Sequence, residues 1–176
     1  VVLLTLGTGV GGGVALGGRL FSGHRGAAAE PGLISVDAEA GAACNSGNRG
    51  SLESFCSLAG LARLSDRNPR ELIEAAGRGE PEALAVWRRY GERLGQGLSS
   101  LIYLFTPELV LIGGGLSAAA PFFLAATEAE VERRVLAVSR EGLRITRAAL
   151  GNGAGALGAA RLALGYLQAG AGPSLG

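Results

Sequence analysis

Two clusters of glycine, each directly behind a short apolar run, constrain this chain more than any other feature of its sequence. Glycine accounts for 31 of the 176 residues, well over twice the ~7% of an average protein, and it follows no collagen-like period. The first cluster, residues 7–13, comes after the apolar run 1–6, and the second, residues 113–115, comes after the run 109–112. Glycine loops let main-chain N–H groups approach an anion closely. The pattern therefore predicts strands that end at ligand-binding loops.

Charge and composition exclude several functions. Hydrophobic residues make up 48% of the chain and charged residues 18%, which supplies one domain with a buried core. All 16 basic residues are arginine, so this chain has neither a Walker-type phosphate lysine nor a Schiff-base lysine. The net charge of +1 lacks the excess typical of nucleic-acid binding, and no apolar run approaches the roughly 20 residues that span a bilayer. We expect no nucleic-acid partner and no contact with a membrane.

The cysteines indicate the cellular compartment of the protein, and the first residues indicate whether the chain is complete. Cys44 and Cys56 are too few for a disulfide scaffold at this length, which fits a reducing compartment. We expect the protein to be cytoplasmic. The chain opens at Val1 inside an apolar run and contains no Met. We expect an N-terminally incomplete chain, although removal of an initiator Met would leave the same start.

Hydrophobic periodicity predicts alternating strands and helices. Residues 1–21 predict a strand, a glycine loop, a second strand, a tight turn and a third strand. Further strands are expected at 33–37, 109–112 and 143–146. Helices are expected at 52–64 after the cap Ser51, at 69–77 after the cap Asn68, at 81–105, at 118–138 after Ser117, and in a last segment that ends near Gln168 before a frayed tail.

The helix expected at 81–105 carries one apolar stripe and three glycines. Gly91, Gly95 and Gly97 leave room for another element to pack closely against it. The inward face is predicted from residues spaced three and four apart, namely Leu84, Trp87, Leu94, Leu98, Leu101, Ile102 and Phe105.

Each glycine cluster has a binding interpretation and a structural one. The loop 7–13 is suited to hold polyphosphate oxygens through its main chain, with Thr8 adding one hydroxyl donor. The alternative is a tight hairpin at a crowded sheet edge. Residues 113–115 lie where open α/β sheets bind ligands, but close packing of a helix on a strand would also need glycine there. The GxGxxG spacing of a dinucleotide-binding fold is absent.

Five segments resemble, in order, the C-terminal lobe of the ROK family. They are LLTLGTGVGGGVALGGRLFSG, AAAEPGLISVD, CNSGNRGSLESF, TPELVLIGGGLS and GNGAGALGAARLAL, and together they span nearly the whole chain. The family comprises sugar kinases, glucokinases prominent among them, and sugar-responsive repressors. The resemblance implies an α/β lobe of the actin-like ATPase (ribonuclease H-like) fold, with a mixed sheet and helices packed on it. Residues 1–176 would form that single lobe.

The resemblance also implies site residues for ATP, Mg²⁺ and a hexose. It places a second phosphate loop at Gly7, Thr8, Gly9, Gly11, Gly12 and Gly13, and it places Gly113, Gly114 and Gly115 beside the adenosine of ATP. Glu30 and Glu53 would orient the sugar, because a carboxylate accepts hydrogen bonds from two adjacent hydroxyls. The alternatives are that Glu30 begins a solvated loop, and that Glu53 is an acid in the first turn of a helix, where the dipole favours it.

The family's structural zinc site is largely lost from this sequence. Of four ligands that the resemblance implies, only Cys44 remains, since Leu33, Ser46 and Ser51 occupy the other places. Zinc needs four donors in a closed site, so we predict that no zinc is bound. The loop is then expected to be held by hydrogen bonds of Asn45, Asn48 and Arg49. We expect Cys56 to be a small core residue and His24 to lie in a solvated loop.

The resemblance leaves catalysis incomplete. In ROK kinases the catalytic aspartate and the first phosphate loop lie in an N-terminal lobe that this chain lacks, and Asp37 matches a position without a chemical role. We therefore predict no catalytic residue here, weak binding and no phosphoryl transfer by the isolated chain. In the complete protein, ATP would phosphorylate a hexose such as glucose, in a dimer or tetramer. The alternatives are the body of a non-catalytic, sugar-sensing repressor and a decayed structural homologue.

Overall fold

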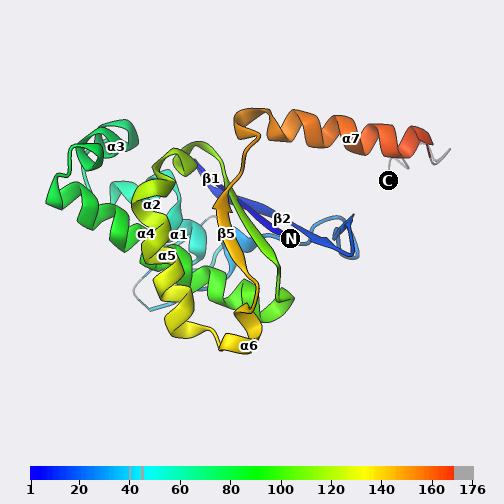
Figure 1. Cartoon of the computed structure of the whole chain (residues 1–176), viewed down its shortest axis with the longest axis horizontal. Helices are drawn as coiled ribbons and strands as arrows, with labels where there is room; N and C mark the ends of the chain where they lie inside the picture. The colour runs from blue at the N-terminus through cyan, green and yellow to red at the C-terminus, as the bar shows by residue number, and fades with distance from the viewer. Residues whose placement is uncertain (40, 45, 169–176) are drawn as a thin grey trace.

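A five-stranded mixed sheet, in the order β3-β2-β1-β4-β5, forms the centre of the fold. The computed structural model describes residues 1–39, 41–44 and 46–168. Strand β1 is antiparallel to β2 and parallel to β4, which is in turn parallel to β5, while β2 and β3 are antiparallel (Figure 1). The strands are β1 (Val2–Leu6), β2 (Val10–Leu16), β3 (Arg19–Leu20), β4 (Leu109–Gly113) and β5 (Arg144–Arg147).

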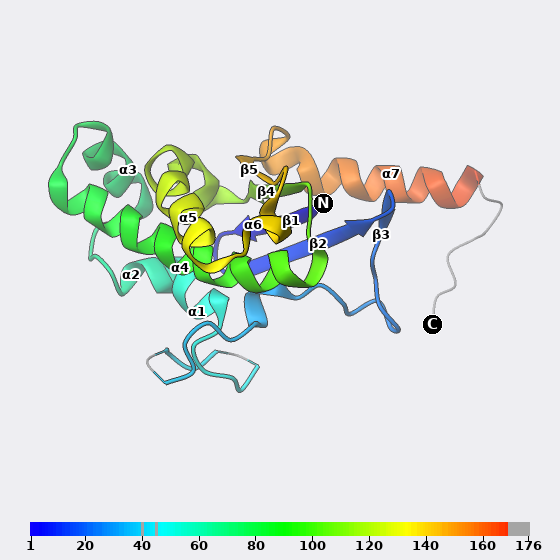
Figure 2. The ribbon, with the colours of Figure 1, turned by 60° about the horizontal axis from the view of Figure 1, so that its bottom comes forward.

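Helices supply most of the rest of the described chain. In the two views α4 and α5 run side by side, whereas α7 extends away from the body (Figures 1 and 2). Among the described residues, no helix is both long and apolar enough to cross a membrane. The helices are η1 (Pro31–Leu33), α1 (Leu52–Cys56), α2 (Leu58–Ala62), α3 (Pro69–Gly77), α4 (Pro81–Phe105), η2 (Gly115–Ala119), α5 (Ala120–Arg134), α6 (Ala137–Arg140), η3 (Gly151–Gly153) and α7 (Ala154–Gln168).

The glycines of α4 permit close packing, as predicted. A Cβ on Gly91 would collide with the carbonyl oxygen of Phe123, and one on Gly95 would lie 2.7 Å from the carbonyl oxygen of Thr127. On another side of the helix, a Cβ on Gly97 would lie 2.7 Å from the Leu52 side chain. Because nothing projects from α4 at these positions, the backbone of α5 and the side chain of α1 reach its surface.

An aromatic cluster fills the space between α4 and α5. Trp87, Tyr90 and Phe123 are fully buried, and their ring centroids lie 5.3–6.2 Å apart. The Tyr90 hydroxyl donates a hydrogen bond of 2.8 Å to the carbonyl of Cys56, which ties α4 to α1. Cys56 is itself completely buried, and burial raises the pKa of its thiol. The prediction that Cys56 is a core residue is confirmed.

Local capping signals placed the start of α3 correctly and misplaced the start of α5. The Asn68 side chain accepts from the Glu71 N–H and the Glu71 carboxylate accepts from the Asn68 N–H, a capping box that begins α3 as expected. Ser117 does not open a helix: it is buried inside the 3-10 turn η2, and α5 begins at Ala120 without a side-chain cap. The predicted helix 118–138 is accordingly split into η2, α5 and α6.

Three other sequence-based expectations were wrong. Leu84 is 38% exposed, so it lies outside the inward stripe of α4, which includes Tyr90 instead. Residues 33–37 form no strand; the 3-10 turn η1 ends at Leu33, and only Ser35 makes an isolated bridge, to Ser51. The single helix expected at 52–64 is broken at Ser57, whose extended backbone separates α1 from α2. The last helix, α7, is described as far as Gln168, and the predicted frayed tail, 169–176, lies outside the described residues.

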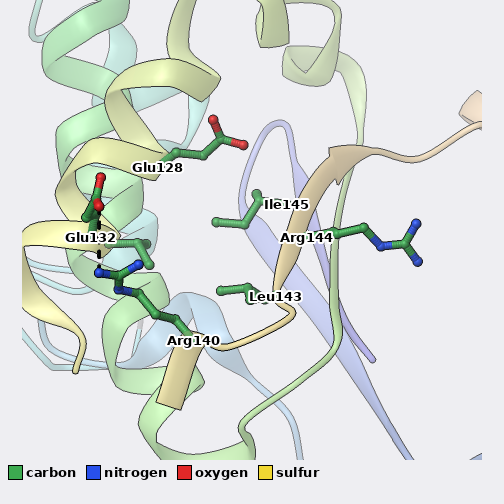
Figure 3. A pocket seen from close by; sticks show the side chains of 7 residues that line it. Glu128, Glu132, Arg140, Leu143, Arg144 and Ile145 are labelled. Carbon is green, nitrogen blue, oxygen red and sulfur yellow. Dashed lines mark ion pairs between the residues drawn. The ribbon is translucent and has the colours of Figure 1, made fainter. Parts of the chain in front are cut away.

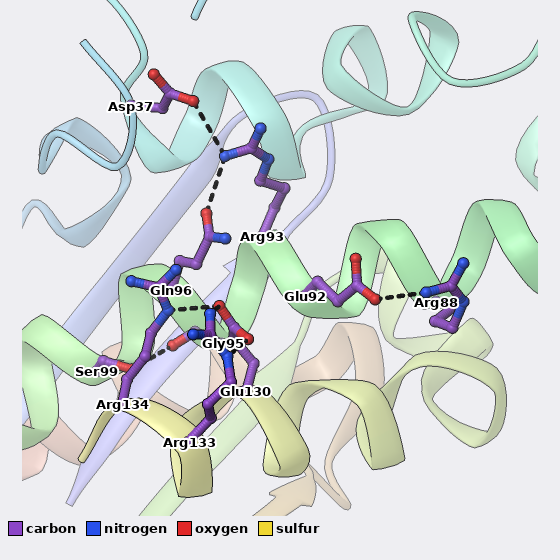
Figure 4. Close-up of polar contacts among 10 residues, drawn as sticks. All are labelled: Asp37, Arg88, Glu92, Arg93, Gly95, Gln96, Ser99, Glu130, Arg133 and Arg134. Carbon is purple, nitrogen blue, oxygen red and sulfur yellow. Dashed lines mark hydrogen bonds and ion pairs between the residues drawn. The ribbon is translucent and has the colours of Figure 1, made fainter. Parts of the chain in front are cut away.

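A cluster of charges on α5 lies against α4. Glu130 forms ion pairs with Arg133, at 2.8 Å, and with Arg134, beside the Gly95 position of α4 (Figure 4). The Glu130 side chain is only 8% exposed, so both arginines compensate a largely buried carboxylate. Hydrogen bonding to Arg133, ahead of the opposing effect of burial, lowers the pKa of Glu130 from an ordinary 4.5 to about 2.

This lowered pKa predicts acid-sensitive stability. The contribution of ionised Glu130 is present in full above about pH 4.5, where the unfolded chain is also ionised, and is lost as the pH falls toward 2. The difference between the two pKa values corresponds to at most about 3 kcal/mol in the free energy of unfolding. Because water screens the exposed arginines, we expect the free energy of unfolding to fall by about 1–2 kcal/mol. Urea unfolding at pH 5 and pH 3 measures this difference. Glu130→Gln should flatten it, and an unchanged pH dependence in that variant would contradict the assignment.

Candidate functional site

A three-residue turn joins the central strand β1 to β2. Leu6 is paired with Val10, and the N–H of Gly7 donates to the carbonyl of Gly9 at 3.0 Å, so Gly7, Thr8 and Gly9 alone make the connection. The N–H of Leu58, the first residue of α2, donates to the Gly7 carbonyl at 2.8 Å. The turn is therefore fixed to the helical side of the lobe as well as to the sheet.

The predicted glycine loop 7–13 is shorter in the structure than in the sequence analysis. Strand β2 begins at Val10, and residues 11–13 pair with β1 instead of forming a loop. A Cβ on Gly12 would collide with the ring of Pro31, so this glycine serves the packing of η1 on the sheet. Gly13 lies opposite Leu3 within the ladder. The glycine composition predicted a loop over the whole cluster, but pairing with β1 limits the turn to residues 7–9.

Glu53 is held directly against this turn. Its Oε2 atom accepts a hydrogen bond of 3.0 Å from the N–H of Val10, and a Cβ on Gly9 would lie 2.5 Å from the same oxygen. Only a glycine at position 9 leaves this oxygen its place. Glu53 also lies in the first turn of α1, so the two interpretations of this residue in the sequence are compatible.

The break at Ser57 was missed by sequence reasoning and positions the turn. The Ser57 side chain accepts from the N–H of Gly60 and so caps α2 at its own start. Because a new helix begins here, the N–H of Leu58 is free to donate to the Gly7 carbonyl. A serine followed by a helical apolar pattern is a capping signal that could have indicated the break, but the continuous apolar spacing from Leu52 to Leu64 concealed it.

Glu30 reaches the same region from a third segment. It is exposed and immediately precedes η1, whose Gly32 packs so closely on the start of β2 that a Cβ there would collide with the carbonyl of Val10. Ala29, just before Glu30, has a left-handed backbone with φ of 62°, a conformation that is uncommon for a residue with a side chain. The chain thus turns sharply to bring Glu30 beside the glycine turn.

The second glycine cluster contributes one residue to the site. Gly114 has φ of 81°, and a Cβ on it would collide with the carbonyl oxygen of Leu6, so glycine is needed on both grounds. Parallel pairing of β1 and β4 brings Gly114 to the end of β1 where the turn begins. Gly113 closes β4, and Gly115 starts η2 on the solvent side.

These segments enclose a hollow of about 390 Å³. Seven of the eleven predicted binding residues line it, and the four others, Gly12, Gly13, Gly113 and Gly115, do not. Within the described residues, the N–H groups of Thr8 and Gly9 donate to no protein atom, whereas the neighbouring N–H groups of Gly7 and Val10 are both occupied. The predicted residues in the hollow are Gly7, Thr8, Gly9, Gly11, Gly114, Glu30 and Glu53.

The charge of this hollow is negative. Among the described residues, two carboxylates line it and no arginine does. Free N–H donors alone do not offset the repulsion between two carboxylates and a polyphosphate, so an anion bound here needs a cation or donors from another part of the protein.

The loop that resembles a zinc site is held by a hydrogen-bonded hairpin. Residues 43 and 49 form a bridge, the Asn48 side chain donates to the Ser35 hydroxyl at 3.0 Å, and Arg49 contributes its main-chain N–H. Asn45 lies outside the described residues. Cys44 Sγ lies 3.0 Å from Ser46 Oγ, and hydrogen bonding to Ser46 lowers the pKa of this thiol. In the part of the chain that the structure describes, no three Cys, His, Asp or Glu side chains are grouped to hold a metal. The absence of zinc stays a prediction.

Other side chains considered in the sequence lie away from the hollow. Asp37 forms an ion pair of 3.2 Å with Arg93 (Figure 4), and His24 is exposed, as expected for a solvated loop. A separate hollow of about 500 Å³ lies between α5, α6 and β5 and contains the Glu132–Arg140 pair, while Arg144 points away from it (Figure 3). None of the predicted site residues lines that hollow.

The mixed sheet and the helices packed on it give this lobe the actin-like ATPase fold. A structure of a glucokinase from Streptomyces griseus in complex with glucose and AMPPNP superposes with a TM-score of 0.81, at 31% identity, over 92% of this chain and 59% of that one. The ROK family model matches residues 1–165, and the chain belongs to the ROK family.

Curated relatives include both enzymes and regulators. A glucokinase from Halalkalibacterium halodurans is 33% identical over 90% of this chain and 54% of the enzyme. The DNA-binding transcriptional dual regulator NagC from Escherichia coli is 28% identical over 85% of this chain and 40% of the regulator. The chain spans little more than half the length of the glucokinases that it matches.

Proposed function

We propose that this chain is the C-terminal lobe of an ATP-dependent hexose kinase of the glucokinase type. The observation that carries the proposal is the hollow at the end of β1. It is lined by Thr8 and Gly9, whose N–H groups have no partner among the described residues, and by two carboxylates from separate segments. Donors suit phosphate oxygens and carboxylates suit sugar hydroxyls, so the hollow combines the two chemistries that a sugar kinase needs.

The residues present fit a nucleotide's phosphates at the turn. The main chain is open at Gly7, where an added Cβ would have no described atom within 4 Å, and Thr8 supplies an N–H and a hydroxyl to the hollow. Mg²⁺ would supply the positive charge that the two carboxylates and the phosphates require. It needs no cage of protein ligands, because Mg²⁺ binds mainly phosphate oxygens and water with one or two carboxylates. Glu30 and Glu53 would bind and orient the hexose hydroxyls.

The lobe alone offers an incomplete site, and we propose that the rest of the protein completes it. No arginine and no candidate catalytic aspartate line the hollow. Phosphoryl transfer depends on positioning and on neutralising charge from several sides, so the isolated chain should bind nucleotide weakly and transfer nothing. The glucokinases that match this chain are nearly twice its length, which leaves room for the missing groups. The use of ATP is consistent with the predicted cytoplasmic location. The homo-oligomer also stays a prediction, which light scattering would test.

A sugar-sensing repressor body is the second candidate. Regulators such as NagC match the same lobe, and a sensor would keep the sugar-binding carboxylates. It would have no need for free donors at Thr8 and Gly9, which favours the kinase. The sequence that precedes this lobe discriminates the two: a D-x-G-x-T segment and an Asn-Asp pair would support the enzyme, and a helix-turn-helix would support the regulator. A decayed homologue would show neither binding nor turnover.

ATP consumption by the full-length protein over a panel of hexoses tests the proposal. Glu30→Ala should raise KM for the preferred hexose at least about tenfold, because it removes charge-assisted hydrogen bonds, and should leave KM for ATP nearly unchanged. The matched control is Glu108→Ala, an exposed glutamate before β4 that lies outside the hollow, and it should behave as the wild type. Robust turnover that ignores Glu30→Ala would contradict the sugar-site assignment.

A further inference from the structure

A second hollow, of about 600 Å³, lies between α1, α2, α4 and the hairpin that ends near Arg49. It shares no lining residue with the hollow at the glycine turn. Phe55 lines it from α1, two positions beyond Glu53, and residues two apart on a helix point to opposite sides. The two hollows therefore flank the same short helix.

Arginine dominates the lining of this second hollow. Four arginines line it, one from the hairpin, one after α2 and two from α4, against a single carboxylate, Glu92. Glu92 is already paired with Arg88 at 2.8 Å, and Arg88 lies outside the lining (Figure 4). The four arginines are Arg49, Arg63, Arg89 and Arg93.

Two of the four arginines are held by other contacts, and within the described residues three of the four form no ion pair. The Arg93 guanidinium lies 4.5 Å over the Phe55 ring and bonds Asp37 and Gln96. The Arg63 side chain donates to the carbonyl of Ser54 in α1. Within the described residues, no carboxylate forms an ion pair with Arg49, Arg63 or Arg89. The hollow therefore holds an excess of positive charge that the side chains of the described residues do not neutralise.

We propose that this hollow is a binding site for a small organic phosphate. Guanidinium groups present forked donors that match phosphate oxygens. The volume suits a small molecule, and the Phe55 ring offers an apolar wall for its carbon skeleton. The hollow at the glycine turn has the opposite charge, with two carboxylates and no arginine. The inference is independent of the proposed kinase activity, because it rests only on the lining of this second hollow.

Calorimetric titration of the full-length protein at low salt tests this site, with glycerol 3-phosphate as the probe. Arg49→Ala combined with Arg89→Ala should weaken binding at least about tenfold, because charge-assisted bonds are lost. Both arginines are exposed, so the double variant should keep its fold, which its melting temperature verifies. The matched control Arg70→Ala, with a side chain 89% exposed on α3, should bind as the wild type does.

Two further arms identify what is bound and where. Gly9→Val alters the glycine turn and should leave glycerol 3-phosphate binding unchanged. Citrate, which carries charge without phosphate, should bind more weakly than the probe. The proposal is overturned if the wild type binds no probe, if the double variant binds as the wild type does, if Gly9→Val abolishes binding, or if citrate binds as tightly and depends equally on the two arginines.

Discussion

Replacement of Gly9 by valine is expected to lower kcat for the proposed ATP-dependent sugar phosphorylation by the full-length protein about 100-fold. The first added carbon would lie 2.5 Å from the Glu53 carboxylate oxygen that accepts the Val10 N–H. Either the turn or Glu53 must move, and a displacement of about 1 Å in a positioning group costs on the order of 100-fold in rate. Steady-state kinetics with ATP and the preferred hexose measure the loss.

The control for this substitution is a glycine in open space. Gly77, in the last turn of α3, has nothing within 4 Å of an added Cβ. Gly77→Ala should leave kcat and both KM values within about twofold of the wild type, because it touches neither hollow. A Gly9→Val protein that is folded and turns over normally would show that the glycine turn does not hold the phosphates.

Phe123→Ala is expected to lower the free energy of unfolding by about 4 kcal/mol. Phe123 is fully buried, and its ring lies 5.3 Å from that of Tyr90 and 6.2 Å from that of Trp87. The space left by the ring cannot close easily, because α4 and α5 already touch through backbone atoms at Gly91. Urea unfolding followed by tryptophan fluorescence measures the change, since Trp87 is the only tryptophan.

Phe21→Ala serves as the comparison for this loss. Phe21 is 42% exposed and follows β3 at the edge of the sheet. Its replacement should cost less than about 1 kcal/mol. Similar losses in the two variants would mean that the aromatic cluster between α4 and α5 is not the main support of the lobe.

Elements specified by neighbouring residues were predictable from the sequence. The capping box of Asn68 and Glu71 needs only four consecutive residues, and the apolar run before Gly113 needs only its own composition to indicate a strand. The approach of α5 to α4 was indicated by Gly91 and Gly95, because glycine in a helix is costly unless something packs on it. In these places the sequence predicts the structure for one of two reasons. Either the contacts that decide the structure are local, or a distant contact requires glycine and is therefore visible in the sequence.

Elements decided by distant contacts were not predictable in the same way. Pairing with β1 made residues 11–13 a strand, although their composition suggested a loop. The break at Ser57 is stabilised by a hydrogen bond to Gly7, about fifty residues earlier in the chain. The sequence named the candidate site residues, but only the structure shows that Thr8 and Gly9 keep free donors and that Gly12 packs against Pro31.

The parallel pairing of β1 with β4 also governs when the hollow can exist during folding. Gly7 and Gly114 are about a hundred residues apart in the chain, and they meet only after the intervening helices have allowed β4 to dock on β1. Contacts of such high sequence separation form late, because closing a long loop costs entropy before any pairing compensates for it. A partly folded intermediate can thus possess most of its helices and still lack the hollow at the glycine turn.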